Sequence, residues 1–215
     1  MLTTPINHLQ LSPGSVVTLP DCSWTEFENL LHDWQNRRFP RVLFVEGSLT
    51  LMTPLPEHEI TNDLLSDMVK MLLKVQGKGY QPFGSTTLKK EGLAGVEPDA
   101  CFYITQYQQM IGRRRLLSDD PPPDLAIEID VTSKTLLTAY RYLKVPEIWI
   151  YDQGKLTIYC LEGDDYRSVF YSQFFGPIPL TEVVPHYLER GWQVGNFQAL
   201  QEWESYCLDW ANAEP

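Results

Sequence analysis

The sequence contains no long apolar run. No stretch approaches the roughly 18 consecutive apolar residues of a membrane-spanning helix, and the first residues lack the basic start and apolar stretch of a signal peptide. These absences predict a cytoplasmic protein with no membrane partner. With 215 residues, 43% of them hydrophobic and 21% charged, the composition is typical of a soluble globular domain with a sizeable core.

Closely spaced cysteine pairs and several common catalytic signatures are also missing. The cysteines form no C-x-x-C pair, which argues against structural zinc. Cys101 and Cys160 lie in apolar, strand-like runs, so we interpret them as small buried hydrophobic residues. His58 begins an H-E-x-x pattern, but Asn62 stands where a metalloprotease has its second histidine. The chain also has no P-loop, no G-x-S-x-G and no G-x-G-x-x-G motif.

Basic residues are scarce relative to acidic ones. The chain has 17 Lys and Arg against 28 Asp and Glu, a net charge of -11. This balance argues against a surface that wraps nucleic acid nonspecifically, although carboxylates that hold metal ions would add to the same acidity. The basic clusters at 89–90 and 113–115 fit a solvated edge strand and loop, and contact with a phosphate backbone is the alternative.

The order of hydrophobic patterns predicts one mixed α/β domain over residues 1–215. Ser23 and Glu26 form a capping box that begins a helix over 23–36. Further helices are predicted after 56, from 134, and near 180–190 and 196–210. The first of these has an apolar stripe formed by Leu64, Leu65, Met68, Met71, Leu72 and Val75, and the second has one formed by Leu136, Leu137, Tyr140 and Leu143. Strands are predicted over 41–52 (a hairpin), 80–90, 98–104, 124–131, 147–160 (a hairpin) and 166–171, with a loop over 91–95.

The stretch 124–131 organises the candidate chemistry. Strand residues alternate between two faces. Leu125, Ile127 and Ile129 therefore share one face, while Glu128 and Asp130 share the other with Asp124 and Ala126. One face is expected to enter a core, and the other to present carboxylates side by side.

Asp99, Glu128 and Asp130 are the candidate residues for a divalent-metal site. Mg²⁺ takes one or two carboxylates together with water and substrate phosphates, and it can activate water for attack on phosphate. The alternative is that Glu128 and Asp130 form the solvated face of an amphipathic strand. Lys134 begins the following helix and could position water or neutralise phosphate, or it could be an exposed lysine. Glu59 is a possible additional metal ligand, although an acid in the first turn of a helix is also explained by the helix dipole.

With these residues identified, the chain resembles the PD-(D/E)XK restriction-endonuclease-like superfamily, and within it a small bacterial family named as restriction endonucleases. The resemblance covers residues from about 24 to about 170. It is carried by Glu97-Pro98-Asp99, by 123–133, by Tyr140 and by the distinctive string 145–152; the Glu46-Gly47 hairpin and the His58 region also match.

The resemblance implies a restriction-endonuclease-like fold, with a mixed β-sheet flanked by helices, an extra N-terminal hairpin and C-terminal helices. The nuclease-like core would span about 40–170, with the helices at 23–36 and 180–210 as additions. Asp99 and Glu128 would bind Mg²⁺, or Mn²⁺ in its place, for hydrolysis of phosphodiester bonds in DNA. The superfamily's signature lysine lies two residues after the second acid, where this sequence has Asp130.

The substitution at this position leaves alternatives open. Lys134 could supply the amine from the helix, and Asp130 could assist with a second ion; the competing hypothesis is an inactive nuclease fold that serves as a binding or assembly module. A metal-dependent hydrolase of another substrate is a third option. Apolar aromatic residues near both ends predict a homodimer: Trp24, Trp34, Trp192, Phe197, Trp203 and Trp210.

Overall fold

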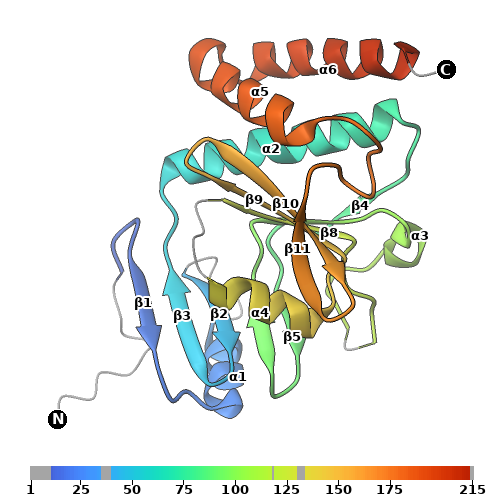
Figure 1. Ribbon diagram of the computed structural model, residues 1–215. Coiled ribbons are helices and arrows are strands. Elements are labelled where there is room, and N and C mark those ends of the chain that lie inside the picture. Colours follow the sequence, from blue (N-terminus) through green and yellow to red (C-terminus); the bar gives the residue numbers. More distant parts are fainter. Residues whose placement is uncertain (1–10, 35–39, 118, 130–133, 214–215) are drawn as a thin grey trace.

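The computed structural model describes residues 11–34, 40–117, 119–129 and 134–213. The helices, shown in Figure 1, are α1 (Trp24–Asp33), α2 (Pro56–Val75), α3 (Tyr107–Met110), α4 (Lys134–Leu143), α5 (Leu180–Val194) and α6 (Asn196–Ala213). The strands are β1 (Val16–Leu19), β2 (Arg41–Val45), β3 (Ser48–Met52), β4 (Gln81–Pro82), β5 (Leu88–Lys90), β6 (Ala94–Val96), β7 (Ala100–Tyr103), β8 (Leu125–Ile129), β9 (Glu147–Asp152), β10 (Lys155–Glu162) and β11 (Asp165–Val169).

A six-stranded mixed sheet has the predicted central strand near its middle. Its order is β11-β10-β9-β8-β7-β4, and β8 runs parallel to β9 while the other pairs are antiparallel. A parallel pair needs a crossover connection, and α4 lies in the chain between β8 and β9. Every residue of β8 is buried, which is typical of a strand covered on both faces. The predicted α/β class is confirmed.

The predicted hairpin of β2 and β3 belongs to a second, antiparallel sheet with the order β1-β3-β2-β6-β5. The single strand predicted over 80–90 is therefore wrong: it divides into β4 and β5, which lie at edges of different sheets. Pro82 cannot extend the hydrogen-bond ladder, and Gly84, with φ of +57°, turns the chain between the sheets.

The predicted loop over 91–95 is also partly wrong because β6 begins at Ala94. Gly95 pairs with Phe44 and lies beneath the ring of Phe27; a Cβ at Gly95 would come within 2.4 Å of that ring. The glycine that suggested a loop thus permits α1 to pack closely on the sheet.

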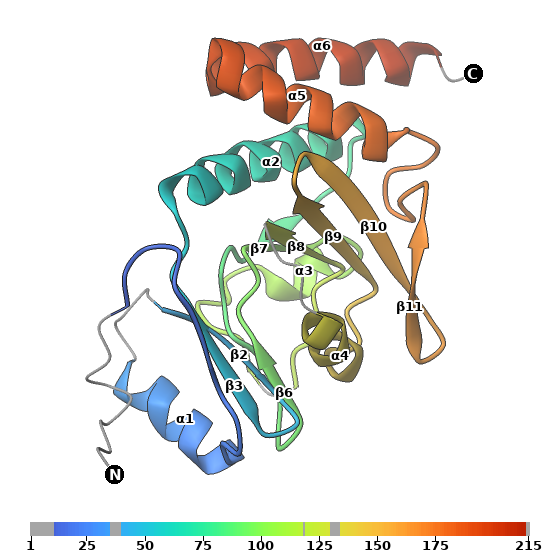
Figure 2. The same ribbon diagram turned by 60° about the vertical axis from the view of Figure 1, so that its left-hand side comes forward.

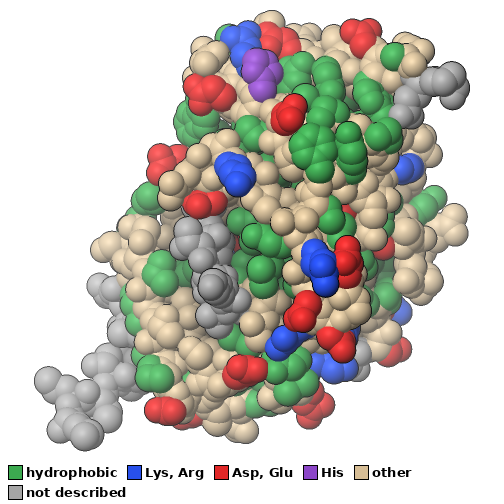
Figure 3. Space-filling model, viewed as in Figure 1, with side chains coloured by type: hydrophobic (Ala, Val, Ile, Leu, Met, Phe, Trp, Pro, Cys, Tyr) green, Lys and Arg blue, Asp and Glu red, His purple; other side chains and the backbone are tan. Residues whose placement is uncertain are grey.

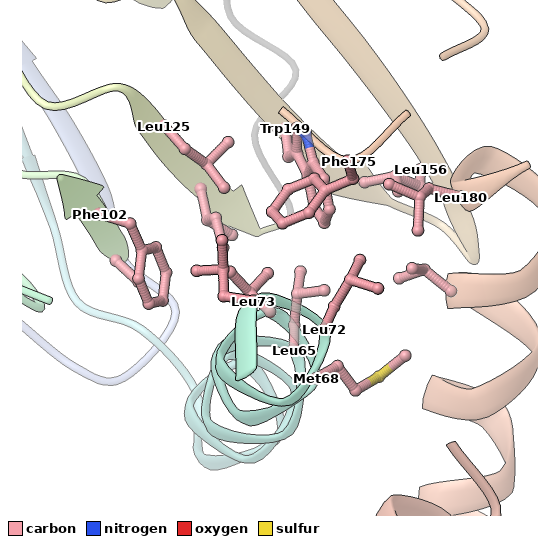
Figure 4. Close-up of a cluster of buried hydrophobic side chains, with 14 of the residues drawn as sticks. Leu65, Met68, Leu72, Leu73, Phe102, Leu125, Trp149, Leu156, Phe175 and Leu180 are labelled. Carbon is pink, nitrogen blue, oxygen red and sulfur yellow. The ribbon is translucent and has the colours of Figure 1, made fainter. Parts of the chain in front are cut away.

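The largest core lies between the six-stranded sheet and α2. The apolar stripe predicted for this helix points toward the sheet, and α5 and α6 cover the opposite side of the helix (Figures 1 and 4). Figure 4 shows Leu65, Leu72 and Leu73 of α2 on the side of the sheet residues Phe102, Leu125, Trp149 and Leu156, while Met68 points toward α5, which begins at Leu180.

Two smaller cores place the second sheet and α4. The first joins α4 to one face of each sheet, with Tyr140 and Ala126 both fully buried in it. The other lies under α1, on the far side of the five-stranded sheet (Figure 2), where Phe27 stacks on Phe44 with ring centroids 5.0 Å apart. The capping box at Ser23 is confirmed: its hydroxyl accepts from the Glu26 N–H at 3.2 Å.

The predicted C-terminal helices are confirmed, and the predicted burial is confirmed for Cys101 but only partly for Cys160. Helices α5 and α6 pack on each other and on α2. Cys101 is buried and Cys160 is half-buried, and burial raises the pKa of each thiol to about 12. Within the described ranges, none of the helices combines the length and apolar character needed to cross a membrane.

Candidate active site

Strand pairing brings two of the predicted acids to one pocket. Asp99 directly precedes β7, Glu128 lies in β8, and these strands are antiparallel neighbours with Ala100 opposite Ile127. Asp99 is 4% exposed and Glu128 is 3% exposed. Both line a pocket of about 200 Å³ that is also bordered by residues of β2, β3 and the start of α2.

Asp99 is fixed by partners from three segments. Its Oδ2 accepts a hydrogen bond from the Ile129 N–H at 2.7 Å and lies 3.1 Å from His58 Nε2. The side-chain amide of Asn62 donates to the Asp99 carbonyl at 3.1 Å. The remaining carboxylate oxygen, Oδ1, pairs with the guanidinium of Arg41. The carboxylate is therefore oriented into the pocket before any ligand binds.

His58 joins the two strands that carry the acids. Its Nε2 lies 3.1 Å from the Ile129 carbonyl as well as 3.1 Å from Asp99 Oδ2. Because both neighbours are acceptors, Nε2 carries the proton and donates. Its Nδ1 lies 3.6 Å from Glu59 Oε1. The histidine thus positions Asp99 against the end of β8.

Glu59 lies behind Arg41 and is absent from the residues that line the pocket. Its Oε1 accepts from Arg41 at 2.9 Å, and its side chain is 42% exposed. Arg41 consequently bridges Glu59 and Asp99. The structure places the predicted additional metal ligand in contact with this arginine.

Glu128 is held in place by Tyr140, whose hydroxyl donates to its Oε1. Burial raises the pKa of Glu128 to about 7, while the Tyr140 hydrogen bond and the positive charge of Arg41 act to lower that pKa. A bound cation would favour the ionised carboxylate over the neutral form.

Glu97 is a third acid in the same pocket, and it is partly buried. Burial also raises the pKa of Glu97, against the hydrogen bond from Thr87, at 2.7 Å, and that from the Val42 N–H, at 3.3 Å. Asp124 lies outside the pocket lining, although strand alternation put it on the face of Glu128: its carboxylate accepts from the Ile104 N–H at 2.6 Å and the Thr105 N–H at 3.0 Å.

The donor atoms of Asp99 and Glu128 fit Mg²⁺ in type and number. A magnesium site commonly uses one or two carboxylates, with water and substrate oxygens as the remaining ligands. Among the described residues, no three His, Cys, Asp or Glu side chains group closely enough to hold a metal ion by themselves. The arrangement therefore fits a two-carboxylate site, in which Arg41 competes for one oxygen of Asp99.

The structure does not describe the side chains of two predicted site residues. Asp130 lies outside the described residues. Lys134 is the first residue of α4, and its side chain lies outside them as well. Their roles stay predictions.

Sequence reasoning assigned no role to Arg41 and treated Tyr140 as part of an apolar helix stripe. One signal for Arg41 was present, since it is a lone charge opening the otherwise apolar strand β2. For Tyr140, only the hydroxyl on an otherwise buried helix face offered a hint, because a buried Tyr O–H usually requires a partner.

Comparison with known proteins agrees with this fold. The model of a family described as "Uma2: Putative restriction endonuclease" matches residues 24–194. The chain is also similar to the crystal structure of "a putative nuclease belonging to DUF820" from Anabaena variabilis, with a TM-score of 0.55 and 17% sequence identity over 83% of this chain and 98% of that one. No curated protein matches the chain.

Proposed function

Because this chain belongs to the family described as "Putative restriction endonuclease", we propose that it is a metal-dependent DNA endonuclease that hydrolyses phosphodiester bonds. One observation carries the proposal: the Asp99 and Glu128 carboxylates, on neighbouring strands, line the same pocket. Buried acids are costly unless they are paired or bind cations, and two carboxylates are the protein ligands that magnesium chemistry commonly uses.

The proposed roles follow from the contacts in the pocket. Asp99 and Glu128 would hold Mg²⁺, or Mn²⁺ in its place, and the ion would supply charge stabilisation at phosphate and a more acidic water. His58 and the Ile129 N–H orient Asp99, and Tyr140 orients Glu128. Lys134 and Asp130 keep their predicted roles: the lysine positions water or phosphate, and the second acid assists.

Cleavage of supercoiled plasmid tests the proposal directly. We expect the full-length protein to nick or linearise plasmid with Mg²⁺ or Mn²⁺, and EDTA to stop the reaction because it removes the ion that the carboxylates hold. A glutamine in place of Glu128 keeps the size of the side chain and removes its charge, so this variant is expected to be inactive. Cleavage that persists in EDTA or in Glu128→Gln would refute the proposed site.

A second candidate function is a nuclease-fold module that binds or assembles without cutting. It is favoured by Asp130 at the position of the superfamily lysine and by the Arg41 guanidinium, which already neutralises Asp99. Calorimetry separates the two candidates, because the module predicts no Mg²⁺ binding above background, whereas the nuclease predicts binding that is lost in Asp99→Asn.

We also propose that the chain forms a homodimer and acts in the cytoplasm. Trp203 is buried within the fold, but Trp192 of α5 is 53% exposed and Phe197 of α6 is 77% exposed. Figure 3 shows hydrophobic side chains gathered over these two helices, and exposed apolar patches often mark interaction surfaces. Light scattering at micromolar concentration should give twice the chain mass; a monomeric mass would contradict the dimer.

A further inference from the structure

Arg41 is a buried cation at the wall of the candidate active site. It is the first residue of β2, its side chain is only 7% exposed, and it lines the pocket together with Asp99 and Glu128. Charged side chains are rarely buried to this degree unless they are paired. The position of Arg41 therefore requires an explanation in terms of its partners.

The partners of Arg41 leave part of its hydrogen-bonding capacity for a ligand. One terminal nitrogen donates to Glu59 at 2.9 Å, and the other pairs with Asp99 Oδ1. A guanidinium has five N–H donors in one plane and binds the paired oxygens of carboxylates and phosphates equally well. Glu59 lies outside the pocket lining, and its ion pair with Arg41 holds the arginine side chain in place. This pair does not use the edge of the guanidinium that faces Asp99.

The acidic lining of the pocket would repel a phosphate group unless a positive charge lies beside it. Its described lining contains three acids, Glu97, Asp99 and Glu128, and it includes Arg41 and His58 but no lysine. A phosphodiester carries a negative charge, so these acids would repel it in the absence of a compensating positive charge. His58 Nε2 already contacts Asp99 and the Ile129 carbonyl, and Arg41 is the one arginine or lysine of the described wall.

We propose that Arg41 is a substrate-contacting residue that donates hydrogen bonds to a phosphate oxygen in this pocket and so supplies the positive charge that the superfamily lysine would otherwise provide. The proposal rests on the proposed nuclease function. It places the cation on β2 rather than on the strand that carries Glu128.

The competing explanation is that Arg41 only clamps β2 to α2 and to Asp99. Substitution by methionine removes the charge while keeping an unbranched apolar stem, and lysine keeps the charge but loses the planar pair of donors. Arg190 offers a matched control. It donates to Glu202 at 2.9 and 2.7 Å and links α5 to α6, away from the pocket.

The test measures binding of a fluorescein-labelled DNA duplex by anisotropy, with Ca²⁺ in place of Mg²⁺, from 50 to 200 mM KCl, together with plasmid cleavage in Mg²⁺. Arg41→Met is expected to weaken binding by about 10-fold or more, as loss of a charge-assisted hydrogen bond does. It should also reduce the slope of log K against log salt by about 0.9, the contribution of one phosphate contact. Arg41→Lys should keep the slope with weaker binding, and Arg190→Met should match the wild type.

The outcomes separate this proposal from the nuclease assignment. If the wild type cuts DNA and Arg41→Met keeps its affinity, salt slope and cleavage rate, Arg41 is only a clamp and the proposal is overturned, while the nuclease function stands. If the wild type neither binds nor cuts DNA, both are overturned. Should Arg41→Met fail to fold by circular dichroism, Arg41→Lys decides the question, because wild-type affinity and cleavage in that variant would overturn the proposal.

Discussion

Replacing Asp99 with asparagine is expected to lower the rate of Mg²⁺-dependent DNA cleavage by more than about 100-fold. Residues that merely support metal ligands typically contribute 10- to 100-fold, so loss of a ligand's charge should exceed that range. The amide keeps the shape of the side chain, and its oxygen can still accept the Ile129 N–H. Single-turnover cleavage of supercoiled plasmid at saturating Mg²⁺ measures the loss.

Asp124→Asn is the matched control for this substitution. Asp124 is also a buried aspartate, 6% exposed, and it lies next to the same pair of strands, but its carboxylate binds the Ile104 and Thr105 N–H groups outside the pocket. The control variant is expected to lose stability, because its carboxylate accepts two backbone N–H groups, but its folded fraction should cleave at the wild-type rate. Equal loss of cleavage in both variants, after correction for the folded fraction, would count against a special role for Asp99.

Replacing Trp203 with alanine is expected to lower the free energy of unfolding by about 3–5 kcal/mol, the range found for large aromatic residues removed from cores. Trp203 is 1% exposed, its indole N–H donates to the Met68 carbonyl at 2.9 Å, and its ring lies 5.2 Å from Tyr187 and 5.6 Å from Tyr206 between centroids. The substitution removes both the packing and the donor that ties α6 to α2. Urea unfolding followed by circular dichroism gives the change.

The same experiment tests the prediction of a single domain. If the C-terminal helices are part of one cooperative unit, wild type and Trp203→Ala should each unfold in one transition, with coincident fluorescence and circular dichroism curves. Ile111→Ala is the control, since this isoleucine is 64% exposed, lies outside α5 and α6, and its loss should change stability by no more than about 0.5 kcal/mol. A separate early transition for α5 and α6 would show that they form an independent unit.

The features of the fold that could be predicted from the sequence depend on patterns among residues close together in the chain. The alternation over 124–131 placed Leu125 and Ile127 together on the face that enters a core, as the structure has them; Ala126, on the face expected to present carboxylates, lies in a second core. The Ser23 capping box and the α2 stripe were likewise readable, since each depends on residues three or four apart. Asp99 and Glu128 were grouped as candidate metal ligands from the residue pattern and again by the family resemblance, and their strand segments are neighbours in the structure.

The division into two sheets and the surroundings of Asp99 depend on contacts between distant segments. His58 reaches the Ile129 carbonyl across 71 residues of sequence, and no local period encodes that approach. The hairpin beginning at Arg41 read correctly as a hairpin, but its place in a separate sheet depends on pairing with β6. The sequence shows Arg41 as a charged residue at the start of an apolar strand. Its pairing with Asp99 is evident only from the structure.

Anomalous diffraction from crystals soaked in Mn²⁺ tests whether Asp99 and Glu128 bind a metal ion, because it locates the ion independently of activity. The account predicts one strong peak in the pocket, with an oxygen of Asp99 and an oxygen of Glu128 each about 2.1 Å away, close to the distances of a magnesium site. A pocket without a peak at saturating Mn²⁺, in which Arg41 still pairs with Asp99, would contradict it.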